Sequence, residues 1–281
     1  MHNYSTRPVL PFESHFDIGL MTAWWRRHWT DSFFYAAIYL LLVFLGQHCM
    51  RSRAPFNLRA PMTVWNWLLA VFSALGAVRM YPELMFTLSQ RGFKASVCDN
   101  SYATGVPSFW ACLFCLSKVL ELGDTAFVVL RKQPLIFLHW YHHITVLLYA
   151  WYSFPQHPAT GRWFTVMNYT VHALMYAYYG LRSARFAVPR YIPMAITTLQ
   201  LCQMVVGCYI GLYTLGVKLN EEECRQSYQN ILYSLLMYFS YFVLFAHYFY
   251  RSYCIQWTPA PTSRKLRNNH VANNHMYKKT A

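Results

Sequence analysis

The stretch Leu138-His139-Trp140-Tyr141-His142-His143-Ile144 places three histidines inside an apolar run that extends over residues 135–154. A run of roughly 20 apolar residues is what a helix needs to cross a bilayer. Ionisable side chains at membrane depth cost free energy and usually face a protein interior or a water-filled cavity. Because the three histidines have the spacing i, i+3, i+4, they lie on one face of a helix. The stretch therefore predicts a membrane-embedded helix bundle with a polar site inside it.

The composition also indicates a membrane protein. Of the 281 residues, 56% are apolar and 19% aromatic, and only 12% are charged, which is about half the charged fraction of an ordinary soluble domain. The formal net charge of +14 could indicate a nucleic-acid partner, but a solvated basic domain would not be this apolar. We therefore expect no nucleic-acid partner and interpret the basic residues as a signal of membrane topology.

Seven apolar segments approach the length of a membrane-spanning helix, and prolines separate most of them. We place these segments at 32–50, 62–81, 107–130, 135–154, 163–182, 191–216 and 229–250. The sequence thus predicts an all-α, polytopic membrane protein whose seven transmembrane helices surround one cavity. The membrane domain, 32–250, is flanked by a lumenal segment at 1–31 and a basic tail at 251–281.

The distribution of Lys and Arg predicts the orientation, because short basic loops stay in the cytosol. Loops 51–61, 131–134 and 183–190, together with Arg182 and the tail from 251, hold 14 basic residues and no acidic residue. The opposite side holds 8 basic and 8 acidic residues. We therefore expect a lumenal N-terminus and a cytosolic C-terminus.

Short features outside the apolar segments bear on the compartment. Lys278 and Lys279 stand four and three positions from the end, which matches the dilysine signal for return to the endoplasmic reticulum; a solvated basic tail is the alternative. Cys98 and Cys224 fall in predicted lumenal loops, where disulfides persist, so we expect them to pair, with two free thiols as the alternative. Asn3 begins an N-glycosylation sequon in the lumenal segment.

Four of the predicted helices carry polar residues at overlapping depths. At a rise of 1.5 Å per residue from the cytosolic helix ends, His142 lies about 12 Å deep, Asp124 about 10 Å and Lys118 about 20 Å. Overlapping depths indicate one shared cavity that opens more readily to the cytosol. The polar positions are Lys118, Glu121, Asp124 and Thr125; His139, His142 and His143; His172, Met175, Tyr176, Tyr178 and Tyr179; and Thr197, Gln200 and Gln203.

Most of these residues also have a purely structural explanation. Lys118 with Glu121 or Asp124 could form a structural ion pair, the glutamines could join neighbouring helices, and the tyrosines could simply pack. Three histidines on one turn of a buried helix are harder to explain in this way.

A histidine cluster can bind a metal or act by itself. Membrane desaturases and hydroxylases hold two irons with several histidine boxes, whereas this sequence has a single box, so we expect no metal and no resident cofactor. Without a metal, an imidazole would serve as nucleophile or general base. A carboxylate such as Asp124 could fix the tautomer of one ring, and Lys118 could bind an anionic group or an enolate oxygen.

Four motifs resemble those of the very-long-chain fatty acid elongases, which are membrane 3-ketoacyl-CoA synthases. They occur in the family's order and spacing, with one departure at Leu122, where many members have a second Glu. The motifs are Lys118-Val-Leu-Glu121-Leu-Gly-Asp124-Thr125, His139-Trp-Tyr-His142-His143, His172-Ala-Leu-Met175-Tyr176-Ala-Tyr178-Tyr179 and Thr197-Thr-Leu-Gln200-Leu-Cys-Gln203.

The resemblance implies the reaction. Malonyl-CoA would condense with a saturated or monounsaturated acyl-CoA of about palmitoyl length, giving a 3-oxoacyl-CoA two carbons longer and releasing CoA and carbon dioxide. The reductases and the dehydratase that complete the elongation cycle would be partners in the endoplasmic-reticulum membrane, and assembly with itself or with other elongases is a further possibility.

The resemblance and the polar faces together divide the candidate residues into two groups. The expected catalytic residues are His139, His142, His143, His172 and Asp124. The expected substrate-binding residues are Lys118, Glu121, Thr125, Met175, Tyr176, Tyr178, Tyr179, Thr197, Gln200 and Gln203. Our mechanistic hypothesis is a two-stage transfer in which His142 takes the acyl group before malonyl-CoA reacts.

Two other classes of protein remain as alternatives. One is a histidine-box oxygenase with a metal centre. The other is a seven-helix receptor, although the sequence has no Asp-Arg-Tyr-like motif after the third apolar segment and no Asn-Pro-x-x-Tyr in the last.

Overall fold

The computed structural model describes residues 8–255. Asn3, Lys278 and Lys279 therefore lie outside the described residues, as does most of the predicted basic tail. Contacts divide the chain into two units, Met1–Phe245 and Ala246–Ala281. The predicted all-α class is confirmed, since residues 8–255 contain helices and turns but no strand.

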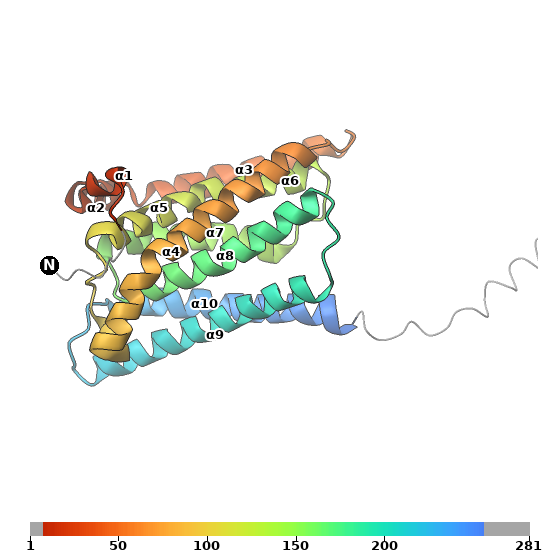
Figure 1. Cartoon of the computed structure of the whole chain (residues 1–281). Helices are drawn as coiled ribbons and strands as arrows, with labels where there is room; N and C mark the ends of the chain where they lie inside the picture. The colour runs from red at the N-terminus through yellow and green to blue at the C-terminus, as the bar shows by residue number, and fades with distance from the viewer. Residues whose placement is uncertain (1–7, 256–281) are drawn as a thin grey trace, which may run out of the picture. The chain divides into compact units, whose positions relative to one another are not determined.

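The helices of the first unit lie roughly side by side, and α4 and α8 are adjacent over most of their lengths (Figure 1). The helices are α1 (Pro11–Ser14), α2 (Ile18–His28), α3 (Asp31–Met50), α4 (Arg59–Cys98), α5 (Gly105–Glu121), α6 (Gly123–Leu130), α7 (Phe137–Ser153), α8 (Gly161–Ser183), α9 (Tyr191–Leu219) and α10 (Tyr228–Phe249), with a 3₁₀ turn η1 (Phe154–Gln156) and a π turn η2 (Tyr250–Cys254).

Two predicted boundaries are wrong. The second segment was predicted to end at residue 81, directly before Pro82. Pro82 instead lies inside α4, whose backbone leaves the helical region only at Gly92 (φ 79°, ψ 174°). A proline removes one hydrogen bond, which neighbouring helices in a bundle can compensate. The third segment, expected to be continuous over 107–130, is divided at Leu122 into α5 and α6.

Four of the described helical segments are long and apolar enough to cross a membrane, namely α3, α4, α9 and the segment Tyr228–Cys254. Each of the seven predicted segments corresponds to helix in the structure, but the number of spans stays a prediction.

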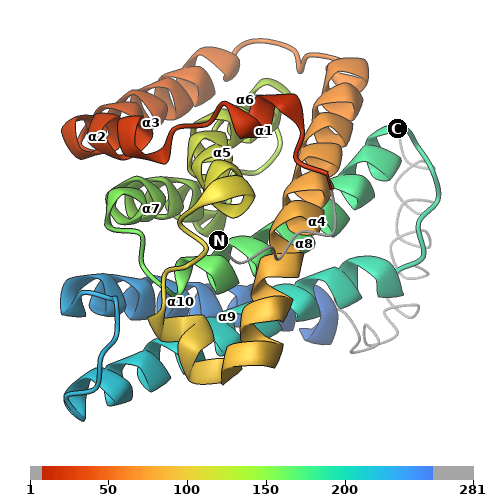
Figure 2. The same ribbon diagram turned by 60° about the vertical axis from the view of Figure 1, so that its left-hand side comes forward.

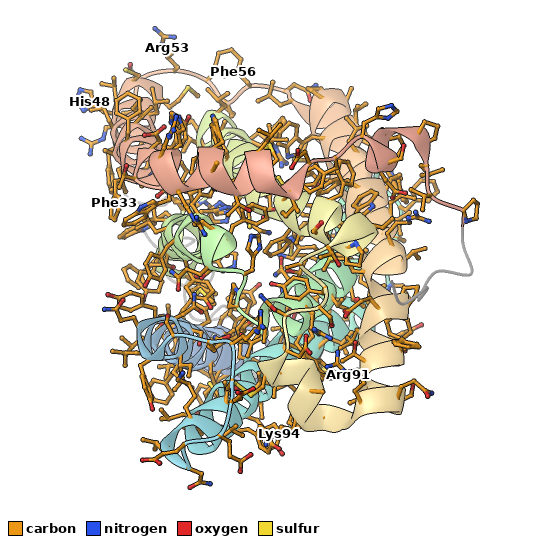
Figure 3. All side chains as sticks on the ribbon, turned by 90° about the vertical axis from the view of Figure 1, so that its left-hand side faces the viewer. Phe33, His48, Arg53, Phe56, Arg91 and Lys94 are labelled. Atoms are coloured by element: carbon orange, nitrogen blue, oxygen red, sulfur yellow. A yellow bond between two sulfur atoms is a disulfide. The ribbon has the colours of Figure 1, made fainter. Side chains whose placement is uncertain are left out.

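Many large apolar side chains lie on the surface while several charged ones are buried, which is the reverse of the usual arrangement in a soluble protein. Phe33, Phe34 and Leu41 on α3 are more than half exposed, whereas Lys118 and Arg162 are 1% and 0% exposed. Figure 3 shows Phe33 pointing outward from its helix. An apolar exterior around buried charges is typical of a protein whose surface contacts hydrocarbon.

Close contact between α4 and α8 depends on a small residue. Gly76 of α4 lies against Tyr169 of α8, and a Cβ at that position would stand 2.5 Å from the tyrosine ring. The Tyr169 hydroxyl donates to the Trp110 carbonyl at 2.9 Å, which joins α8 to α5 as well. Helix α1 packs against α5, and α2 packs against both α5 and η1 (Figure 2).

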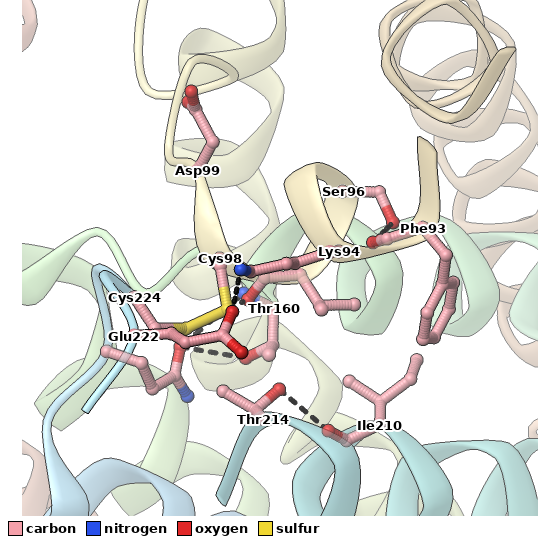
Figure 4. The surroundings of a disulfide bond; sticks show 12 residues. Phe93, Lys94, Ser96, Cys98, Asp99, Thr160, Ile210, Thr214, Glu222 and Cys224 are labelled. Carbon is pink, nitrogen blue, oxygen red and sulfur yellow. Dashed lines mark hydrogen bonds and ion pairs between the residues drawn. A yellow bond between two sulfur atoms is a disulfide. The ribbon is translucent and has the colours of Figure 1, made fainter. Parts of the chain in front are cut away.

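A disulfide links Cys98 at the end of α4 to Cys224 in the loop between α9 and α10, with 4.3 Å between the Cα atoms (Figure 4). The Arg225 amide donates to the Cys98 carbonyl at 2.9 Å, and the Ala159 amide donates to the Arg225 carbonyl at 3.3 Å. An ion pair between Lys94 and Glu222 lies beside the disulfide. Three loops that are distant in sequence are thereby joined at one end of the bundle.

Asp99 strengthens the same end of the bundle. Burial opposes ionisation of its carboxyl group, but hydrogen bonds from Arg91 and from the Ser101 amide outweigh burial and hold the pKa of Asp99 below its ordinary value. Asp99 therefore remains ionised at neutral pH.

Replacing both cysteines, Cys98→Ser with Cys224→Ser, is expected to destabilise the protein by about 2–4 kcal/mol, because the link closes a long loop in the unfolded chain. The measurement is the thermal midpoint of the detergent-purified protein, with the exposed Cys49→Ser as the control. An unchanged midpoint in the double variant would show that the disulfide does not support the fold.

Candidate active site

The three histidines pack together on the first turns of α7, which begins at Phe137 directly after an extended residue, Ile136. The ring centroids of His139 and His143 are 4.6 Å apart, and those of His142 and His143 are 5.6 Å apart. His143 is only 6% exposed. One turn of helix thus presents a compact group of imidazoles to the interior of the bundle.

His139 is oriented by a threonine. The Thr125 hydroxyl lies 2.9 Å from His139 Nε2 and 2.7 Å from the Tyr39 hydroxyl. This chain of hydrogen bonds connects α3, α6 and α7, and it restricts the rotation of the His139 ring.

Lys118 and Glu121 form a buried ion pair one turn apart on α5. Lys118 Nζ lies 2.7 Å from Glu121 Oε1 and 3.0 Å from Asn168 Oδ1 on α8. His172 Nδ1 is 3.7 Å from Glu121 Oε2, which is within ion-pair range but beyond a hydrogen bond. The lysine and His172 therefore belong to one polar cluster that joins α5 to α8.

Asp124 makes different contacts from those expected. Trp65 Nε1 on α4 donates to its Oδ1 at 2.6 Å, and the Tyr176 hydroxyl on α8 donates to its Oδ2 at 2.7 Å. Both carboxylate oxygens are thus engaged by aromatic donors, and the orienting contact to a histidine comes from the next residue, Thr125. Asp124 connects α4, α6 and α8.

An internal cavity lies between α5, α7, α8, α9 and α10, and most of its lining is apolar. The predicted residues His142 and Gln203 contribute polar groups to it, together with Asn168. The His142 ring also lies 4.9 Å from the ring of Tyr241, whose hydroxyl donates to the His142 carbonyl at 3.2 Å.

A second cavity of about 600 Å³ lies at the other side of the histidine turn, and we call it the basic mouth. His139, Asp124 and Tyr176 line it from the interior, and the exposed Tyr179 lines it as well. Its positive charge comes from four arginines, Arg59, Arg131, Arg182 and Arg185. The histidines therefore stand between a wide basic opening and a narrow apolar cavity.

The four remaining predicted substrate-binding residues line neither cavity: Met175, Tyr178, Thr197 and Gln200. The Gln200 amide donates to Met175 Sδ at 3.4 Å, and the Thr197 hydroxyl donates to the Pro193 carbonyl at 3.0 Å. The Tyr178 ring packs against Tyr179 with centroids 5.4 Å apart.

Three residues of the site were not predicted from the sequence. Asn168 begins a glycosylation sequon, Asn168-Tyr169-Thr170, inside a predicted apolar segment, and we did not assign it to the site. It precedes His172 by four residues, so the two share a face of the helix. Trp65 and Tyr241 gave no signal, because an aromatic residue in an apolar helix resembles ordinary packing.

No group of three or more His, Cys, Asp or Glu side chains in residues 8–255 has the arrangement of metal ligands.

The chain belongs to the ELO: GNS1/SUR4 family, whose profile matches residues 24–260. It is 51% identical over 269 residues to very long chain fatty acid elongase 6 of Drosophila melanogaster, covering 94% of this chain and 83% of that protein. It is 48% identical over 243 residues to the human elongase of the same name, covering 86% and 91%. Human very long chain fatty acid elongase 3 is 43% identical over 234 residues, covering 83% and 86%. Family membership and the apolar helices together identify a multi-pass membrane protein.

Changing Thr125 to Val is expected to lower activity about tenfold, because the His139 ring loses a hydrogen bond worth roughly 1–1.5 kcal/mol. Thr125→Ser keeps the hydroxyl and should retain most of the activity. The comparison is made by incorporation of labelled malonyl-CoA in microsomes. Equal losses in the two variants would point to packing of the threonine methyl group instead.

Proposed function

We propose that this chain is the condensing enzyme of fatty acid elongation, a very-long-chain 3-oxoacyl-CoA synthase. Its substrates would be malonyl-CoA and a saturated or monounsaturated acyl-CoA of about palmitoyl length, as the names and similarity of the elongase 6 relatives support. The observation that carries the proposal is the position of the histidine turn, with the basic mouth on one side and the apolar cavity on the other.

The two cavities match the two halves of an acyl-CoA. The phosphates of CoA are anionic and suit the arginines of the basic mouth, since guanidinium groups bind phosphate through paired hydrogen bonds. The acyl chain has no polar atom and suits the apolar cavity. That cavity is narrow, with a volume of about 80 Å³, so the chain would enter by moving flexible side chains such as Met204 and Met237.

The first stage of the reaction we propose is acyl transfer to His142, the one histidine of the turn that lines the apolar cavity. An imidazole nitrogen attacks the thioester carbonyl carbon, the carbon–sulfur bond breaks, and CoA leaves with the proton of the imidazole. His139 and His143 would position the ring. The Asn168 amide, which lines the same cavity as His142, and the Lys118 ammonium bonded to Asn168 would stabilise the oxyanion.

In the second stage malonyl-CoA replaces CoA in the basic mouth and loses carbon dioxide. The resulting enolate carbon attacks the acyl carbon and the carbon–nitrogen bond breaks. The departing imidazolate of His142 takes up a proton from water and returns to its free form. His172, beside the Lys118–Glu121 pair, would stabilise the enolate oxygen. Because decarboxylation supplies the electron pair of the new carbon–carbon bond, this scheme uses no metal and no resident cofactor.

The same proposal extends to location and partners. We place the protein in the endoplasmic-reticulum membrane with the basic mouth toward the cytosol, because Arg59, Arg131 and Arg185 of the mouth belong to the predicted cytosolic loops. The 3-oxo product must next be reduced, dehydrated and reduced again, so a ketoacyl reductase, a dehydratase and an enoyl reductase would act beside it. Assembly with copies of itself or with other elongases is part of the same proposal.

Replacing His142 with Ala is expected to lower turnover by at least about 10²-fold, since the group that carries the acyl chain is lost. The exposed His48→Ala, on α3, is the matched control. Full activity of His142→Ala would contradict the assignment.

Mass spectrometry after incubation with acyl-CoA alone tests the covalent stage. An acyl adduct on His142 and release of CoA are expected. If neither is found, the covalent stage is wrong and His142 would act as a general base.

Replacing Arg182 with Ala is expected to raise the KM for acyl-CoA about tenfold with little change in kcat, because a charged contact to CoA is removed far from the reacting atoms. The effect should shrink at high ionic strength. Arg53→Ala, an exposed arginine outside the mouth, is the control. A lower kcat at unchanged KM would show that Arg182 does not bind CoA.

A further inference from the structure

Opposite His142 the apolar cavity ends at buried residues, among them Tyr102 and Phe154, and we call this region the closed end. Tyr102 precedes α5 and is 4% exposed. The other residues of the closed end come from the end of α7, η1, the following loop and the start of α8: Ser153, Phe154, Pro158 and Gly161. An acyl chain that starts at His142 would therefore point its terminal methyl group toward the Tyr102 ring.

The Tyr102 ring is held in place by three contacts. Its hydroxyl donates to the Pro158 carbonyl at 2.9 Å. The guanidinium carbon of Arg162 lies 5.4 Å from the centre of the ring. Gly161 completes the seat, because a Cβ at that position would collide with the Tyr102 hydroxyl. The Tyr102 hydroxyl thus occupies the space that a side chain at position 161 would otherwise fill.

Arg162 is itself fixed. Its side chain is fully buried, and it forms an ion pair with Glu83 at 2.9 Å and contacts the Ser101 hydroxyl at 3.2 Å and the Asp99 carbonyl. The Pro158 carbonyl also accepts from the Gly161 amide at 2.8 Å, so displacing Tyr102 would remove one of its two donors and disturb a buried charge. The disulfide between Cys98 and Cys224 adjoins this network through Asp99.

The closed end is therefore stiffer than the side walls of the cavity. The walls include Met204 and Met237, whose flexible side chains adapt to the shape of a ligand. The closed end, in contrast, is formed by Tyr102, whose hydroxyl is hydrogen-bonded and whose ring lies against the buried Arg162. An acyl chain can widen such a cavity more easily than it can lengthen it.

The length of the cavity is set by α7. From His142 to Phe154 the helix rises about 18 Å, close to the length of an extended palmitoyl chain. We propose that Tyr102 is the residue that limits acyl chain length, by blocking the terminal methyl group at the closed end of the cavity. This inference rests on the proposed function, since it assumes that the cavity holds the acyl chain of the elongation substrate.

A photo-crosslinking experiment tests the position of the methyl end in the unaltered protein. Palmitoyl-CoA with a diazirine at the terminal carbon is bound to the full-length protein in microsomes and irradiated, and the labelled peptides are identified by mass spectrometry. Labelling of Tyr102, Phe154 or Gly161 is expected. Labelling confined to other elements, such as α9 or α10, would overturn the inference.

Two variants test the effect on specificity. In Tyr102→Ala the ratio of stearoyl-CoA to palmitoyl-CoA elongation should rise about tenfold, since two further methylenes gain room to be buried. In Tyr102→Phe the ring remains and only the hydroxyl is lost, so the ratio should stay close to that of the unaltered protein. A folded Tyr102→Ala protein with an unchanged ratio would overturn the inference.

The design separates this inference from the proposed function. If the unaltered protein elongates no acyl-CoA in the presence of malonyl-CoA, the proposed function fails. If it elongates palmitoyl-CoA and Tyr102→Ala has the same product distribution, only the role of Tyr102 fails. Where Tyr102→Ala does not accumulate, the crosslinking result on the unaltered protein decides.

Discussion

An ionisable side chain inside an apolar bundle must be satisfied by other groups of the protein, and much of this structure follows from that requirement. Lys118 is almost completely buried, and its ammonium group contacts Glu121 and Asn168. Glu121 neutralises the charge from within α5, and the hydrogen bond to Asn168 joins α5 to α8. Removing one partner would leave a buried charge uncompensated, at a cost of about 3–5 kcal/mol. The polar cluster is therefore part of the fold as well as part of the site.

The position of the histidine turn between two unlike cavities explains how one protein handles a substrate with a charged head and an apolar tail. In the proposed mechanism the head would stay in the basic mouth, the thioester would reach His142, and the tail would enter the apolar cavity. The end of the bundle beyond that cavity is held by the Cys98–Cys224 disulfide and by the buried Arg162 network. In the proposed model, this fixed far end and an adaptable wall would give the cavity a defined length without requiring a rigid shape along its sides.

The comparison between sequence and structure separates local from long-range information. The position of the three histidines on one helix face and the all-α class were predicted correctly, because both depend on helical periodicity and on apolar runs. The boundaries at Pro82 and Leu122 were not, because whether a helix continues past a proline or breaks at a leucine depends on what its neighbours supply. The contact of Thr125 with His139 was not predicted, although the two residues belong to neighbouring motifs of the sequence.

The sequence by itself determined the apolar segments, the facing histidines and the family to which the chain belongs, since each is encoded in the order and spacing of nearby residues. Only the tertiary structure decided the partners of these groups. Asp124 bonds to Trp65 and Tyr176, residues more than 50 positions away in the chain, and Tyr102, which precedes α5, lines the same cavity as His142 of α7. Such contacts depend on how the helices lie against one another, which the periodicity of any single helix does not specify.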